Sequence, residues 1–140
     1  MYEYACTVDR VVDGDTVDVI LDLGFDILYR TRVRLYGIDT PESRTRDLDE
    51  KARGKLAGKY LKDAIDAGDK VVIQTKLKDS KGKFGRVLGD VVVDGKNINQ
   101  SMINDHMAVA YHGQSKDDIE LQHLANREIL IEAGLHTPVD

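Results

Sequence analysis

Apolar residues in the first 37 positions recur in short runs that small turn residues interrupt. Valine, isoleucine, leucine and tyrosine are frequent over residues 8–12, 16–23 and 29–37. Asp13-Gly14 and Gly24 separate these runs, and such residues tolerate the backbone angles that tight turns require. The pattern predicts three strands joined as a meander.

Beyond residue 46 the apolar spacing changes to that of a helix. Residues 47–66 place seven apolar side chains on one helical face, with Gly68 as a plausible stop: Leu48, Ala52, Leu56, Tyr60, Leu61, Ala64 and Ile65. Residues 71–77 and 85–93 predict two more strands, joined by a polar turn. Two further helices are expected over residues 99–107 and 117–133, the second ending just before Gly134.

Five short strands, with one helix after the third and two at the end, define the expected fold class. We predict an α+β, β-rich protein: a five-stranded OB-type Greek-key barrel with three helices. A length of 140 residues with 41% hydrophobic content is compatible with one domain over residues 1–140. An OB barrel alone does not define a function, because such barrels also act as pure binding modules.

Two clusters of acids flank the basic third strand. The first contains Asp13 and Asp15, and the second contains Asp39 and Glu42, with Arg34 on the strand between them. Taken alone, the first cluster is better explained as a hairpin turn, and the second fits a strand-to-helix junction as well as it fits a site. Their pairing favours a site, because converging carboxylates bind hard cations and a neighbouring arginine binds phosphate. The chemistry indicated is metal-assisted phosphodiester cleavage.

Four segments carry a resemblance to a known family. They are Val12-Asp13-Gly14-Asp15-Thr16-Val17, Arg34-Leu35 through Ile38-Asp39-Thr40-Pro41-Glu42, Lys83-Phe84-Gly85-Arg86, and Val93-Asp94-Gly95-Lys96 followed by Asn99. With these segments the chain resembles the staphylococcal nuclease (thermonuclease) family over nearly its whole length. The resemblance implies the OB-type fold and a calcium-dependent nuclease that cleaves DNA and RNA with little sequence specificity, leaving 3′-phosphates.

The resemblance also implies roles for individual residues of the two acid clusters. Asp15 and Asp39 correspond to side-chain calcium ligands, and the carbonyl of Thr40 to a third ligand. Glu42 would orient or deprotonate the attacking water, and Asp13 would hold the metal site in place from behind.

Further residues are implied to contact the substrate. Arg34 and Arg86 would bind the phosphate, and Lys83, Phe84 and Tyr111 would bind the rest of the substrate. Phe84 stands where the resembled enzyme has a tyrosine that hydrogen-bonds the terminal phosphate, so one such bond is expected to be absent here. For Arg30, Arg32, Arg44 and Arg46 we expect ordinary solvated arginines or loose steering of the nucleic-acid backbone, because they lie outside the matched positions.

Calcium suits the candidate ligands better than zinc does. Ca²⁺ accepts carboxylates, carbonyls and water in irregular geometry, whereas zinc prefers cysteine and histidine. Cys6 is the single cysteine, and the four histidines show no paired metal-binding spacing. The histidines are therefore expected to be mostly surface or helix residues. The chain also lacks a P-loop pattern, which argues against a nucleotide kinase or ATPase.

The charge is unevenly distributed, although the net charge of −5 at first argues against a polyanionic partner. Residues 29–59 carry nine Lys or Arg against five acids, and residues 70–86 carry six against one. Both ends of the chain are acidic. A basic middle is compatible with single-stranded or frayed DNA and RNA as partners of a monomer.

The sequence also bears on the location of the protein in the cell and on alternative functions. The first residues lack a secretory pattern and no run approaches membrane-spanning length, so we expect no membrane association and a cytoplasmic protein, phage-encoded or host-intracellular. The alternative function is a catalytically inactive OB-type module that binds nucleic acid or protein. A calcium-binding module unrelated to nucleic acid is weakened because the chain has no EF-hand loop.

Overall fold

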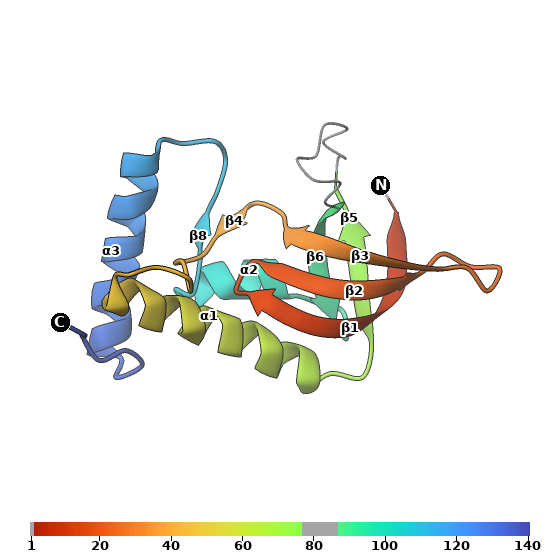
Figure 1. The fold of residues 1–140 in the computed structure, drawn as a ribbon, viewed down its shortest axis with the longest axis horizontal. Coiled ribbons are helices and arrows are strands. Elements are labelled where there is room, and N and C mark those ends of the chain that lie inside the picture. The colour runs from red at the N-terminus through yellow and green to blue at the C-terminus, as the bar shows by residue number, and fades with distance from the viewer. Residues whose placement is uncertain (1, 77–86) are drawn as a thin grey trace.

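Five strands form a closed barrel in the computed structural model, which describes residues 2–76 and 87–140 (Figure 1). β1 (Glu3–Asp13), β2 (Thr16–Asp22) and β3 (Leu28–Leu35) form an antiparallel meander. β5 (Val71–Thr75) pairs antiparallel with both β1 and β6 (Val87–Val93), and β3 closes the barrel by pairing parallel with β6. The predicted β-rich α+β class and OB-type barrel are confirmed.

Three short strands and three helices complete the architecture. β4 (Ile38–Asp39) pairs with β8 (Val109–Ala110), and β7 (Lys96–Asn97) extends the barrel sheet beside β6. The helices are α1 (Leu48–Asp66), α2 (Ile98–Asn104) and α3 (Lys116–Glu132). α1 runs along the barrel, and α3 lies at the end of the molecule opposite the β2–β3 turn (Figure 1). No helix among the described residues is both long and apolar enough to cross a bilayer.

Each helix begins where the sequence supplies a capping side chain. Asp47, Asn97 and Ser115 accept hydrogen bonds from backbone N–H groups three residues later, at 3.0, 3.1 and 3.1 Å. Such caps satisfy N–H groups that have no partner within the helix. α3 ends just before Gly134, whose positive φ of 76° suits glycine, as predicted.

The core lies inside the barrel and beneath the helices. The largest side chains with almost no exposure come from β2, β3, β5 and β6 and from β4, α1 and α2 around them: Val17, Val19, Val33, Leu35, Ile38, Leu61, Ile73, Val91 and Met102. Full burial of such a side chain contributes roughly 1.5–3 kcal/mol each.

The predicted apolar face of α1 is partly wrong. Leu48 is 54% exposed, whereas Asp49 and Arg53 are buried on the same helix. The buried line runs through positions four apart, from Asp49 to Ile65, and it begins with charged residues because they meet other charged groups there. Apolar spacing cannot identify such a line.

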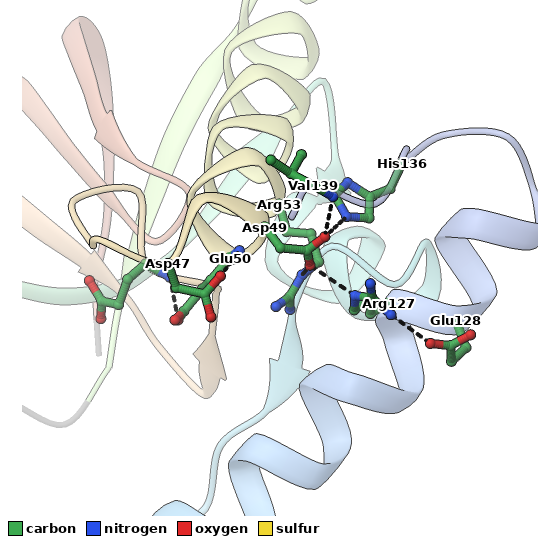
Figure 2. Close-up of polar contacts among 9 residues, drawn as sticks. Asp47, Asp49, Glu50, Arg53, Arg127, Glu128, His136 and Val139 are labelled. Atoms are coloured by element: carbon green, nitrogen blue, oxygen red, sulfur yellow. Dashed lines mark hydrogen bonds and ion pairs between the residues drawn. The ribbon is translucent and has the colours of Figure 1, made fainter.

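Asp49 joins three segments that are distant in the sequence (Figure 2). Its carboxylate accepts from Arg53 Nε at 3.1 Å on α1 and from Arg127 Nε at 2.8 Å on α3. It also accepts from His136 Nε2 at 3.0 Å and from the backbone N–H of Val139 at 2.9 Å. Burial alone would raise the pKa of Asp49, but these four donors hold that pKa well below its usual range. The C-terminal tail and α3 are thereby fixed to the start of α1.

Other predicted boundaries moved by a few residues. β1 begins at Glu3 instead of Val8, because Glu3, Tyr4 and Ala5 pair with β5, a contact that is distant in the sequence. The second predicted helix starts at Ile98 and ends at Asn104. The predicted turn at residues 78–83 and the adjoining positions lie outside the described residues.

Candidate active site

The turn between β1 and β2 lies beside β4 and the residues that follow it. Asp13 ends β1 and Asp15 lies in the turn, and Asp39 ends β4. The β2–β3 register pairs Thr16 with Arg34, which brings the arginine next to the turn. Local strand pairing thus positions a basic side chain among acids that come from two separate segments.

Arg34 lies between the two predicted metal-binding carboxylates. Its Nη1 is 3.1 Å from Asp15 Oδ2, and its Nη2 is 3.9 Å from Asp39 Oδ1. Nη1 also lies 3.2 Å from the carbonyl oxygens of Leu35 and Ile38, to which it donates. These contacts fix the orientation of a guanidinium whose side chain is 23% exposed. The structure therefore brings Asp15, Asp39 and Arg34 together.

Glu42 is exposed and lies within electrostatic reach of the same acids. Partial loss of hydration raises the pKa of Glu42, and the charges of Asp15, Asp39, Asp13 and Glu50 raise it further. Its backbone N–H donates to Glu50 Oε2 at 3.1 Å. One corner of the protein thus carries more carboxylates than Arg34 can neutralise.

This excess of oxygen donors fits a hard cation. Asp15 and Asp39 could supply carboxylate oxygens and the buried Thr40 a main-chain carbonyl, which is the ligand chemistry that Ca²⁺ accepts. Within residues 2–76 and 87–140, no three or more histidine, cysteine, aspartate or glutamate side chains form a ready metal cage. A cation here would therefore rely on two side chains, the main chain and water.

Asp13 contacts the segment after Glu42. Its Oδ1 accepts a hydrogen bond from the hydroxyl of Ser43, at a separation of thirty residues in the sequence. This bond ties the β1–β2 turn to the Glu42 segment. A supporting role for Asp13 behind the metal site stays a prediction.

Two glycines allow the site segments to pack directly on each other. A Cβ added to Gly14 would lie 2.8 Å from Ala57 Cβ on α1 and 3.1 Å from Thr40 Cγ2. A Cβ added to Gly54 would lie 2.6 Å from both the carbonyl carbon and the oxygen of Glu42. The backbone of Glu42 therefore rests on a helix surface that has no side chain at that point.

Replacing Gly54 with alanine should destabilise the protein by about 1–3 kcal/mol, because the new methyl group must displace the backbone at Glu42. The matched control is Gly58→Ala on the same helix, where the nearest atom to a new Cβ is 3.9 Å away. That control should gain up to about 1 kcal/mol from helix propensity. Urea unfolding of both variants measures the difference, and equal stabilities would contradict the packing argument.

His123 contacts the site and was not predicted to do so. Its Nε2 lies 2.7 Å from Asp39 Oδ2, and its side chain is only 8% exposed. His136, at Asp49, is also buried. The histidines were expected to be mostly surface or helix residues; His123 does lie on α3, whereas His136 is neither at the surface nor in a helix. One signal was available: His123 lies two helical turns before the buried Leu130 and so shares its face.

Tyr111 lies just beyond β8 and is 46% exposed. Its backbone N–H donates to the carbonyl of Gly37 at 2.8 Å, which fixes the chain near β4. A substrate contact by Tyr111 stays a prediction. Lys83, Phe84 and Arg86 lie outside the described residues, so their predicted roles stay predictions as well.

The remaining arginines of the third strand form surface ion pairs. Arg30 Nη1 lies 3.3 Å from Asp9, and Arg32 Nε lies 2.8 Å from Asp18. Both side chains are exposed, as expected of solvated strand arginines, and a loose steering role for them stays a prediction. Arg44 and Arg46 are exposed in the segment that precedes α1.

Comparison with known proteins agrees with this arrangement. The family described as staphylococcal nuclease homologue matches residues 32–130. Endonuclease YhcR of Bacillus subtilis (strain 168) is 36% identical over 115 residues, which cover 78% of this chain and 9% of that protein. The SPbeta prophage-derived endonuclease YokF of the same organism is 35% identical over 106 residues, covering 75% of this chain and 34% of that protein.

A third relative from the same organism, endonuclease YncB, is 34% identical over 106 residues, covering 75% of this chain and 47% of that protein. The chain therefore spans less than half the length of each of these three relatives. The match over residues 32–130 includes the second half of β3, the Asp39–Glu42 segment and α1. The chain belongs to the staphylococcal nuclease family.

Proposed function

We propose that this protein is a calcium-dependent nuclease that hydrolyses phosphodiester bonds in DNA and RNA with little sequence specificity, leaving 3′-phosphates. The observation that carries the proposal is the convergence of Asp15 and Asp39 on Arg34, with Glu42 in electrostatic contact with both acids. Three relatives whose names call them endonucleases support the same activity.

In this mechanism Glu42 acts on water and Arg34 on phosphate. Glu42 accepts a proton from a water molecule while the oxygen of that water attacks phosphorus. The raised pKa of Glu42 makes it a better base than a fully hydrated carboxylate. The bond from phosphorus to the 5′-oxygen breaks, the 5′-oxygen takes up a proton from solvent, and the 3′-oxygen keeps the phosphate. Glu42 then releases its proton to solvent. Arg34 stabilises the charge that accumulates on the phosphate oxygens, with Arg86 as its proposed counterpart.

A calcium ion held by Asp15, Asp39 and the carbonyl of Thr40 would supply positive charge next to the phosphate. His123 would support this site by fixing one oxygen of Asp39, leaving the other oxygen toward Arg34. Holding the carboxylate in one orientation lowers the cost of ordering it when a ligand binds.

The proposed partners are single-stranded or frayed DNA and RNA, bound by a cytoplasmic monomer. Binding through phosphates and loosely stacked bases carries little sequence information. The alternative is an inactive OB-type binding module. The presence of the acids and Arg34 in one place favours an enzyme, since a module that only binds does not require this combination.

Incubation of the purified protein with labelled single-stranded DNA and RNA separates the two functions. We expect cleavage of both in millimolar calcium, none with a chelator, and 3′-phosphate ends by mass spectrometry. The double variant Asp15→Asn, Asp39→Asn serves as the inactive control. If the protein binds both substrates in calcium and leaves them intact, the binding module replaces the nuclease.

A further inference from the structure

An open groove of about 320 Å³ lies between β1 and α1. Val11 and Val12 of β1 form an apolar wall, and Gly54 and Gly58 of α1 line the side facing them. These two elements run beside each other along the barrel (Figure 1). The size corresponds to the lower end of the range for small-ligand sites, roughly 300 Å³.

The groove begins at the candidate active site. Asp13 and Ser43 line it, and their side chains are hydrogen-bonded to each other. Ser43 directly follows Glu42, and Asp13 precedes Asp15 by two residues. The groove therefore adjoins the two segments that carry Asp15 and Glu42.

Three lysines of α1 line the groove: Lys55, Lys59 and Lys62. Their spacing of four and three residues puts them on one helical face. Lys59 and Lys62 also pair with Asp63 and Asp66, but these are exposed pairs within one helix and therefore weak. Lys55 forms no ion pair with any of residues 2–76 or 87–140.

Gly58 has no packing reason to be a glycine. A Cβ there would meet only the backbone nitrogen of Gly14, at 3.9 Å. Glycine in the middle of a helix is less favourable than alanine, so its presence lowers helix stability without a steric requirement. The missing side chain keeps the groove open.

We propose that this groove binds the segment of a single nucleic-acid strand that flanks the cleaved phosphodiester. The phosphates would contact the three lysines, and the sugars or bases would lie against the apolar wall, a combination that suits a single strand. The inference rests on the proposed nuclease function for the presence of a strand at Glu42. The groove itself is a separate binding element that extends the site along α1.

The test compares binding of a twelve-nucleotide single strand with binding of a dinucleotide, by fluorescence anisotropy in a chelator at several salt concentrations. The variant Lys55→Gln, Lys59→Gln, Lys62→Gln should bind the long strand at least tenfold more weakly at low salt. Its slope of log affinity against log salt should fall by about 2, since each lost phosphate contact removes about 0.7. The ratio of long-strand to dinucleotide affinity should also fall.

The matched control is Lys70→Gln, Lys96→Gln, Lys116→Gln, which removes the same charge from exposed positions elsewhere. This control should bind the long strand within about twofold of the native affinity, because lysines that contact phosphates, and not the net charge of the protein, determine binding. A second variant, Gly58→Leu, fills the groove without removing charge. It should weaken long-strand binding while the melting temperature stays level or rises.

Equal losses in the groove and control triples would overturn the inference, as would unchanged long-strand binding by Gly58→Leu. If the native protein cleaves in calcium and the groove variants bind the long strand as tightly as it does, the groove inference is wrong and the nuclease proposal stands. If the groove variants bind the long strand more weakly but the native protein does not cleave it in calcium, the nuclease proposal is wrong and the groove remains a strand-binding site.

Discussion

Replacing Glu42 with glutamine should lower the turnover of single-stranded DNA in calcium by about 10² to 10³, the range expected when a general base is lost. Glutamine keeps the size of the side chain but cannot accept the proton of the attacking water. The effect should fall on kcat more than on KM, because the base acts in the transition state. Single-turnover cleavage at saturating substrate measures it.

Two controls separate this loss from a change in folding. Glu120→Gln changes an exposed glutamate on α3 in the same way and should leave turnover unaltered. Circular dichroism of Glu42→Gln should match that of the native protein, since the side chain is exposed, and its urea midpoint should be equal or slightly higher because the substitution removes a carboxylate that neighbouring acids repel. Near-native turnover in Glu42→Gln would remove this residue from the mechanism.

Replacing Asp49 with alanine should cost about 3 kcal/mol of unfolding free energy or more at neutral pH. The change leaves the buried side chains of Arg53 and His136 without their anionic partner. This expected loss is at the lower end of the range for broken buried ion pairs, because the Arg127 side chain is 26% exposed and water can partly replace its contact with Asp49. Urea unfolding measures the loss, and Asp66→Ala at an exposed ion pair should change little.

The same aspartate should give the protein a specific sensitivity to acid. Its pKa in the folded state is lowered, so its contribution is fully present above the unfolded value of about 3.9 and is lost as pH falls toward the folded pKa. Asp49→Asn lacks this dependence. The stabilities of native protein and Asp49→Asn should therefore converge below about pH 4, and a constant difference would exclude Asp49 as the cause.

The barrel strands and the three helices could be predicted from the sequence, because the spacing of apolar residues and the residue types in turns are local properties. The Asp13-Gly14 turn, the caps at Asp47 and Ser115, and the glycine after α3 each act within a few residues. The short strands β4, β7 and β8 were not predicted. Two residues carry too little pattern to be distinguished from loop.

The candidate site was predictable in its acids and not in its supports. Asp15, Asp39 and Arg34 come from two adjacent segments with a distinctive composition, and they do converge. His123 reaches Asp39 across eighty-four residues, and Arg127 reaches Asp49 across seventy-eight. Contacts of that range depend on how α3 docks, which no local pattern specifies.

The contact of His123 with Asp39 means that the site depends on α3, which is distant from it in the sequence. A fragment that ends before residue 116 keeps all five barrel strands and α1, yet one oxygen of Asp39 loses its buried partner. Such a fragment also loses Arg127, His136 and Val139 from Asp49, at the helix on which Glu42 rests. Proteolysis of the chain in the loop before α3 would therefore affect Asp39 and Asp49. Adding α3 and the C-terminal tail back as a separate peptide is the direct way to restore the contacts of these two acids.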